Sequence, residues 1–145
     1  TMLSIEETTV ALEAAKAVCD LPVLCSLTME SDGHLLFGGT AREAVETLSA
    51  LGASAVGLNC SVGPDQLEAV VSELCAAATV PVLVKPNAGL PVIDAQGHAH
   101  YSMSPDEFAA AMLRLVECGA RVVGGCCGTN PDYIHALKAA LETTK

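Results

Sequence analysis

Three cysteines form the strongest chemical pattern in this sequence. The segment GGCCGT at 124–129 places Cys126 beside Cys127, and GLNC at 57–60 ends in Cys60. Adjacent side chains on a regular strand point to opposite faces, so this pair reaches one ion only if the backbone leaves the pleat, which the flanking glycines allow. Thiolates favour zinc among the common cytosolic ions. Three protein ligands leave the fourth tetrahedral position open, as in catalytic zinc sites.

The charge of such a centre indicates its chemistry. Zinc with three thiolates carries one net negative charge, so it polarises a carbonyl poorly but keeps a bound ligand electron-rich. A substrate thiol bound there loses its proton near neutral pH and remains a good nucleophile. The three cysteines therefore predict a site that alkylates the sulfur of a substrate.

Other interpretations of the cysteines stay open on spacing alone. Buried cysteine is a common core residue, and packing is the expected role of four of them. These four are Cys19, Cys25, Cys75 and Cys118. Cys-Cys is not one of the compact zinc spacings such as C-x-x-C, so packing competes with metal binding for the other three. A vicinal disulfide is strained, and a reducing compartment disfavours it.

Two further segments are rival sites. The segment HAH at 98–100 is a second pair of metal-ligand residues, but we find no acidic or thiol partner at helical spacing in its polar loop. Gly124, Gly125 and Gly128 resemble a phosphate cradle at a helix start, yet no lysine or arginine accompanies them. These three glycines instead fit the metal hypothesis, since they permit dihedrals that are closed to other residues.

An internal repeat places the cysteines at the ends of strands. Residues 51–65 and 118–132 align without gaps at an offset of 67 residues, which spans two strand–helix units. In both copies a helix ends, a strand follows, a cysteine lies at its carboxyl end and the next helix begins. Cys60 and Cys127 are therefore equivalent, on the face where βα proteins gather their chemistry.

The elements that position these residues are a helix followed by four strand–helix units. Four continuous apolar runs are typical of parallel strands buried on both faces. They lie at 22–29, 54–60, 80–87 and 121–127. Helix-start signals precede five amphipathic segments. They lie at Ser4, Thr40, Pro64, Ser104 and Asn130. In the last helix, Ile134, Leu137 and Leu141 are expected to face inward. The predicted fold class is α/β, a parallel βα array.

Composition narrows the class of protein further. The 145 residues fit a single domain, 1–145, and no apolar run approaches the roughly 18 residues of a membrane span, so no membrane partner is expected. The 17 acidic and 7 basic residues give a net charge of −10 without a basic cluster, so no nucleic-acid partner is expected either. An odd number of cysteines, seven, and the lack of a signal-peptide pattern indicate a reducing, cytoplasmic compartment.

Three ordered motifs resemble the homocysteine S-methyltransferase family. They are GLNC at 57–60, VKPNAGLP at 84–91 and GGCCGT at 124–129. The resemblance covers essentially the whole chain, and it is greatest to the homocysteine-binding module of the cobalamin-dependent members. It implies that the three cysteines of these motifs hold zinc, and that Asn59 and Asn87 contact the substrate. It implies no catalytic group beyond the zinc site.

The family reaction moves a methyl group from methylcobalamin, S-methylmethionine or betaine to zinc-bound homocysteine, which gives methionine. The resemblance thus implies a zinc-dependent S-methyltransferase with homocysteine as acceptor. Methylcobalamin on a corrinoid partner module is the expected donor, with the other two donors left open. The alternative function is a non-catalytic zinc-binding half-barrel fragment that needs a complementary N-terminal half.

The family fold is a (β/α)8 TIM barrel of roughly 200 residues or more, whereas this chain has 145 residues and four expected strands. The chain therefore resembles the second half of the barrel, with Thr1 and Met2 resembling the end of the fourth strand. Four parallel strands without closure leave two open edges and an uncovered inner face. We expect either pairing with a separate N-terminal half-barrel or self-association.

Overall fold

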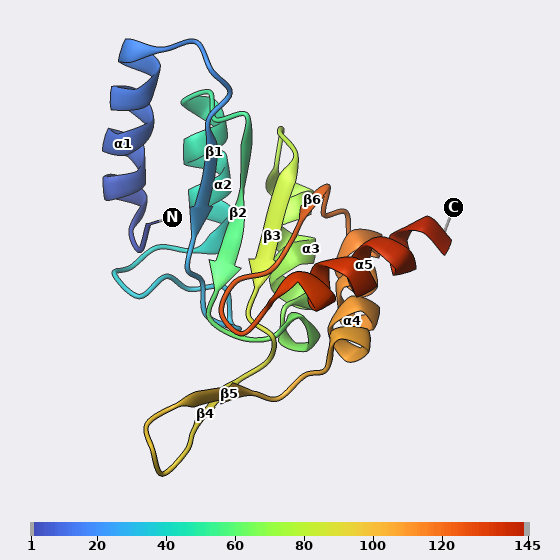
Figure 1. Ribbon diagram of the computed structural model, residues 1–145. Coiled ribbons are helices and arrows are strands. Elements are labelled where there is room, and N and C mark those ends of the chain that lie inside the picture. Colours follow the sequence, from blue (N-terminus) through green and yellow to red (C-terminus); the bar gives the residue numbers. More distant parts are fainter. Residues whose placement is uncertain (1, 144–145) are drawn as a thin grey trace.

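The predicted alternation of helices and strands is present in the structure, a computed structural model that describes residues 2–143 (Figure 1). The helices are α1 (Ile5–Val18), α2 (Ala41–Ala50), the 3-10 turn η1 (Pro64–Gln66), α3 (Glu68–Ala77), α4 (Pro105–Glu117) and α5 (Pro131–Thr143). The strands are β1 (Leu24–Leu27), β2 (Ala55–Cys60), β3 (Val82–Pro86), β4 (Pro91–Ile93), β5 (Ala99–Tyr101) and β6 (Val122–Val123).

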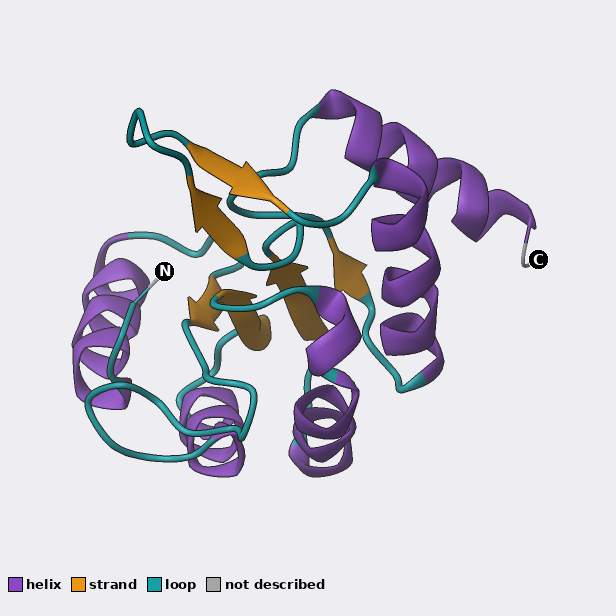
Figure 2. Cartoon of the chain, turned by 90° about the horizontal axis from the view of Figure 1, so that it is seen from below, coloured by secondary structure: helices purple, strands orange, loops and turns teal. Residues whose placement is uncertain are grey.

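The main sheet is parallel and follows the order β1-β2-β3-β6. Each strand therefore lies beside the strand of the preceding strand–helix unit, which is the order in one arc of a (β/α)8 barrel. Viewed along the strands, helices α1 to α4 lie in an arc around one side of this sheet (Figure 2). The predicted α/β fold class, a parallel array of strand–helix units, is confirmed.

Met2 extends the sheet at the edge of β1 by a single paired residue. It forms an isolated parallel bridge with Leu27. Its amide donates to the Ser26 carbonyl at 3.1 Å, and its carbonyl accepts from Thr28 at 3.1 Å. Met2 thus lies where the sequence predicts the end of a preceding strand, while Thr1 lies outside the described residues.

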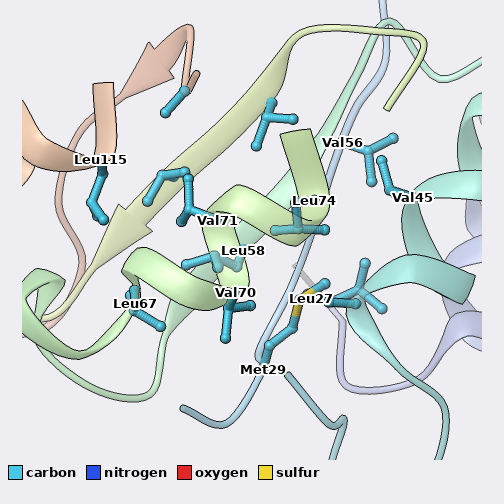
Figure 3. Close-up of a cluster of buried hydrophobic side chains, with 14 of the residues drawn as sticks. Leu27, Met29, Val45, Val56, Leu58, Leu67, Val70, Val71, Leu74 and Leu115 are labelled. Carbon is cyan, nitrogen blue, oxygen red and sulfur yellow. The ribbon is translucent and has the colours of Figure 1, made fainter. Parts of the chain in front are cut away.

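The core fills the space between the sheet and the helices. Leu58 of β2 lies against Val70 and Val71 of α3, and Val56 lies beside Val45 of α2, as Figure 3 shows. All of them are almost completely buried. Burying a leucine or valine side chain stabilises a fold by about 1.5–3 kcal/mol, so this layer holds the strands in register.

On its other face, strand β2 carries smaller residues. Because side chains alternate along a strand, Ala55, Gly57 and Asn59 of β2 point away from the helices. A Cβ atom on Gly57 would overlap the Leu83 carbonyl of the neighbouring strand, so only glycine fits there. The close approach of β2 and β3 at this point carries Asn59 and Cys60 to the carboxyl edge of the sheet.

The helix starts confirm the capping signals. The Ser4 hydroxyl accepts a hydrogen bond from the Glu7 amide at 3.1 Å, and Thr40 and Ser104 each form a complete capping box. Pro64 opens the short η1 turn instead of an α-helix, and α3 begins at Glu68. These caps fix where each helix begins relative to the strand that precedes it.

Cys19 and Ile134 are more exposed than the sequence predicts, while the other residues expected in the core are buried or partly buried. Cys19 is exposed because it follows the last residue of α1, where the chain leaves the core. Ile134 is 46% exposed because α5 lies at the end of the array, where no further helix of this chain covers it, whereas Leu137 is buried. Leu141 is partly buried against the core. Of the other cysteines expected to pack, Cys25 is buried and Cys75 and Cys118 lie half-buried at the core margin.

Two segments differ from the predicted strands. The run 121–127 forms a strand only at Val122 and Val123, because the residues after it turn to place the cysteine pair. The polar loop that contains HAH is a β-hairpin made of β4 and β5, which projects beyond the carboxyl edge of the sheet (Figure 1). Within residues 2–143, no helix has the length and apolar character needed to cross a membrane.

Candidate metal centre

The three predicted cysteine sulfurs converge at the carboxyl edge of the sheet. Cys60 Sγ lies 3.6 Å from Cys127 Sγ, and Cys126 Sγ lies 3.9 Å from Cys127 Sγ. All three sulfurs lie within 4.8 Å of one another. A tetrahedral zinc with Zn–S distances of about 2.3 Å holds its sulfurs about 3.8 Å apart. The sulfur triangle therefore has the size that a zinc ion needs, with one face left for a further ligand.

Cys60 reaches this triangle through an unusual backbone. It has φ 64°, and Ser61 after it has φ 63°, a conformation that L-residues other than glycine rarely adopt. Such residues cost about 1–3 kcal/mol each and tend to cluster at functional sites. The turn takes Cys60 out of the pleat of β2 and aims its sulfur toward the other two.

The cysteine pair is placed by a tight turn after β6. The Cys126 amide donates to the Pro86 carbonyl at 2.8 Å, and the Cys126 carbonyl accepts from the Thr129 hydroxyl at 2.7 Å. Of the three glycines expected to have special dihedrals, only Gly128 has a positive φ, +80°. Gly125 is needed for a different reason, since a Cβ atom there would meet the Thr129 side chain.

Asn87 ties the two cysteine-bearing loops together. Its Nδ2 donates to the Ser61 carbonyl at 2.9 Å, and its Oδ1 accepts from the Cys127 amide at 3.1 Å. The Asn87 side chain is buried. One amide thus fixes the distance between the loop after β2 and the turn after β6. The expected contact of Asn87 with substrate stays a prediction.

Asn59 has an acceptor atom without a partner. Its side chain is 5% exposed, and its Oδ1 is buried with no hydrogen-bond partner in the structure. The Asn59 side chain also lies near Cys126 and helps to lower the pKa of that thiol. A buried amide oxygen that lacks a donor costs about 1–3 kcal/mol. The atom is therefore free to accept a hydrogen bond from a ligand next to the sulfurs.

The sulfurs differ in their affinity for protons. Desolvation opposes ionisation of Cys126, but hydrogen bonds from Cys60, Cys127 and Asn59 outweigh it and lower the pKa of Cys126. The hydrogen bond with Cys60, together with burial, raises the pKa of Cys127 to about 11. The cluster thus holds at least one proton at neutral pH, which a metal ion would displace.

Tyr101 of β5 lies against the same cluster, and the sequence interpretation missed it. A Cβ atom on Gly128 would overlap the Tyr101 ring, so the ring rests directly on that glycine. Burial raises the pKa of Tyr101, and a hydrogen bond with the Cys127 side chain raises it further. The phenol is therefore protonated at neutral pH. The only signal in the sequence was the position of Tyr101 in the segment between two site motifs.

The rival sites do not have comparable geometry. His100 Nε2 lies 2.7 Å from Asp94 Oδ2, and His98 Nδ1 lies 3.5 Å from the same oxygen. The histidines therefore do have an acidic partner, Asp94, which we overlooked in the sequence. Among the described residues, however, the three cysteines are the only group of histidine, cysteine or carboxylate side chains close enough to share one ion.

The glycine-rich segment does not form a phosphate cradle of the usual kind. The helix that follows it, α5, begins at Pro131, which has no amide hydrogen to donate. Cys126 and Cys127 also remain free thiols and form no vicinal disulfide. Both observations leave the metal interpretation as the one that the geometry supports.

The fold and the site together define a class: a parallel βα protein with a cluster of three cysteines at the carboxyl ends of its strands. The sequence model of the family described as homocysteine S-methyltransferase matches residues 1–141. The chain belongs to this family, as its motifs indicated.

The relatives are longer proteins. Methionine synthase from Mycobacterium leprae (strain TN) is 42% identical over 122 residues, which cover 83% of this chain and 10% of that protein. Methionine synthase from Mycobacterium tuberculosis (strain ATCC 25618 / H37Rv) is 40% identical over 126 residues, which cover 86% of this chain and 10% of that protein. The chain thus spans about a tenth of the length of these synthases.

Solved structures show the same fold. The apo form of the homocysteine methyltransferase MmuM from Escherichia coli matches with a TM-score of 0.76 and 27% identity, over 97% of this chain and 48% of that one. Its metallated form matches with a TM-score of 0.73 and 26% identity, over 94% of this chain and 42% of that one. The arc of strands described above therefore corresponds to less than half of a related enzyme.

Proposed function

We propose that this chain carries the zinc-binding and homocysteine-binding part of an enzyme that methylates homocysteine to methionine. The observation that supports this most directly is the triangle of Cys60, Cys126 and Cys127, whose sulfur separations suit one tetrahedral ion. When bound, zinc supplies a positive centre that lowers the pKa of a substrate thiol and keeps its sulfur nucleophilic.

The residues of the chain take separate roles in this proposal. The three cysteines hold the ion and leave one position open for the homocysteine sulfur. Asn59 offers its unpartnered Oδ1 as an acceptor for a polar hydrogen of the amino acid. Asn87 holds the two loops in register, with any substrate contact made through the remaining amide hydrogen. Methyl transfer itself needs no further acid or base of this chain.

The partners follow from the share of the relatives that the chain covers. We infer that a separate N-terminal half-barrel completes the fold, since the chain matches only 48% of the MmuM chain. Grooves lie at both ends of the array, one along α1 and one between α4 and α5. Both have acidic rims, made by Glu6 and Glu7 and by Asp106 and Asp132. These like charges favour a distinct partner over a second copy.

The proposed methyl donor follows from the relatives of the chain. Identity of about 40% to methionine synthases supports methylcobalamin carried on a corrinoid module, rather than S-methylmethionine or betaine. The seven cysteines are free, in keeping with the reducing, cytoplasmic location expected from the sequence, which stays a prediction.

The second candidate function is a zinc-binding module without activity of its own. It is favoured by the coverage of the related enzyme, since the chain matches only 48% of the MmuM chain. Homocysteine separates the two functions. A substrate-binding centre takes up the thiol at the open position and releases a proton, whereas an inert centre releases none.

The test is metal content and homocysteine binding in variants of the purified chain. We expect one zinc per chain in the unaltered protein and in Cys19→Ser, a control that removes an exposed cysteine far from the site. Cys126→Ser should lose most of the zinc and all proton release on adding homocysteine, because an alcohol is a poor zinc ligand. Full zinc content in Cys126→Ser would contradict the assignment.

A further inference from the structure

The β4–β5 hairpin is attached to the metal centre at its base. The Ala88 amide donates to the Cys127 carbonyl at 2.9 Å, and the Met103 amide donates to the Ala88 carbonyl at 3.1 Å. On the outgoing side, the Leu90 amide donates to the Ser102 hydroxyl at 3.3 Å. The first residues on both sides of the hairpin are thus fixed to the turn that carries the cysteine pair.

This attachment sets the position of Tyr101. Tyr101 is the last residue of β5 and pairs with Pro91 of β4, two residues before Met103. Its ring rests on Gly128, the residue directly after Cys127. The Cys127 sulfur acts on the phenol and raises its pKa, in addition to the larger effect of burial. The ring therefore contacts the backbone of the turn, and the hydroxyl lies near the sulfur that the turn carries.

We propose that Tyr101 is a positioning residue of the metal centre, whose ring, seated on Gly128, holds the hydroxyl as a hydrogen-bond donor to Cys127 Sγ. This inference rests on the proposed function, because it assigns Tyr101 a role toward the same ion. A thiolate that accepts a hydrogen bond gives less charge to its metal. Tyr101 therefore tempers the electron density that the centre passes to a bound substrate sulfur, and it fixes the direction of the Cys127 side chain.

Cobalt provides a readout of this effect other than activity. Co²⁺ replaces zinc in thiolate sites, and its sulfur-to-metal charge-transfer absorption reports the electron density on the ligands. In the full chain, Tyr101→Phe keeps the ring on Gly128 and removes only the hydroxyl. We expect it to bind one Co²⁺, with the charge-transfer band at lower energy and with affinity roughly 3- to 10-fold weaker than in the unaltered chain.

Tyr133→Phe is the matched control. The Tyr133 hydroxyl donates to the Met103 carbonyl at 2.6 Å, so this variant loses a phenol that supports the base of the hairpin but does not reach a sulfur. Its cobalt spectrum should equal that of the unaltered chain. If Tyr101→Phe also has an unchanged band, the hydroxyl does not act on Cys127 and the inference fails, while the proposed function stands.

If the chain takes up no cobalt, the proposed function is overturned. A measurement without metal then tests the inference about Tyr101 on its own. Tyr101→Ala uncovers the turn, so iodoacetamide should label Cys127 at least about twofold faster than in Tyr101→Phe, which keeps the ring. Cys25, 6% exposed on β1, must stay unlabelled in both variants as proof of folding. Equal Cys127 rates in the two folded variants would show that the ring does not cover this turn, and would overturn the inference.

Discussion

Cys126 and Cys127 are neighbours in the chain, yet their environments give them opposite tendencies to ionise. Cys126 has a lowered pKa because the hydrogen bonds it receives outweigh its desolvation. Cys127 has a pKa of about 11, raised first by the hydrogen bond with Cys60. At pH 8 only about one Cys127 side chain in a thousand is a thiolate. Of this adjacent pair, Cys126 is therefore the side chain that ionises more readily.

This difference predicts the order of alkylation in the metal-free chain. At pH 8 we expect iodoacetamide to label Cys126 before Cys127, because the thiolate is the reactive form. Peptide mass mapping over time gives both rates. Exposure predicts the reverse order, since Cys127 is exposed and Cys126 is half-buried. Faster labelling of Cys127 would thus contradict the assigned protonation. Cys60→Ser should narrow the difference, because it removes the first cause of the raised pKa of Cys127.

Only part of the site could be predicted at the scale of residues. The three cysteines follow from the repeat and the motifs, since a strand end is a local feature that sequence reveals. The positive φ of Cys60 and Ser61 could not be predicted, because neither residue type favours it and the Asn87 bridge that accompanies it spans 26 residues. Tyr101 was missed for the same reason, because its contact with Gly128 crosses an unpredicted hairpin.

At the scale of elements, the hairpin and the cysteine turn depend on each other. Gly128 serves both, since its backbone has φ +80° and its bare Cα supports the Tyr101 ring. Gly97, in the turn between β4 and β5, has φ +85° but no atom within reach of an added Cβ. The two glycines therefore share the dihedral requirement and differ only in the contact.

A change to alanine should destabilise the chain by different amounts at Gly97 and at Gly128. Gly97→Ala should lower the free energy of unfolding by about 1–2 kcal/mol, the cost of a left-handed backbone for an L-residue. Gly128→Ala should lower it by more, because the methyl group also displaces the Tyr101 ring, and it should reduce metal affinity. Urea unfolding and metal titration of both variants measure the effects. Equal losses in both would mean that the ring does not rest on Gly128.

The helices were easier to predict than the strand ends. Ser4, Thr40 and Ser104 begin helices because a short polar side chain satisfies a free backbone amide within three residues, which is a local effect. Strand β6 is shorter than the apolar run 121–127 predicts, because the chain turns after Val123 and the Cys126 amide donates to the Pro86 carbonyl. The hairpin was missed because its strands are exposed and lack an alternating pattern.

At the scale of the whole molecule, the array has an uncovered edge beside β1 and α1. Large apolar side chains are exposed there on α1, β1 and the loop between them. They are Val10, Val18, Leu21 and Leu24. Large apolar side chains exposed at the edge of a sheet are typical of a surface that another chain covers. That residues 1–145 behave as a single independent domain stays a prediction.

The acidic rims predict how the isolated chain associates. Because both grooves carry carboxylates and the net charge is −10, self-association should be weak at low salt and should strengthen as sodium chloride screens the repulsion. Sedimentation velocity at about 0.05 M and 0.5 M salt tests this. Val10→Ser should weaken association at both concentrations without unfolding the chain, since Val10 is exposed. A compact monomer under all conditions would contradict the predicted self-association.

The separation of the metal ligands along the chain also bears on folding. Cys60 and Cys127 lie 67 residues apart, whereas most sheet pairings join consecutive units. A bound ion would cross-link the two ends of the segment that contains α3, β3, the hairpin and α4. The chain-entropy relation for a cross-link that closes such a loop gives about 4 kcal/mol. During synthesis this cross-link can form only after the last strand, β6, has emerged. Metal uptake would therefore mark the moment at which the four-stranded sheet is complete.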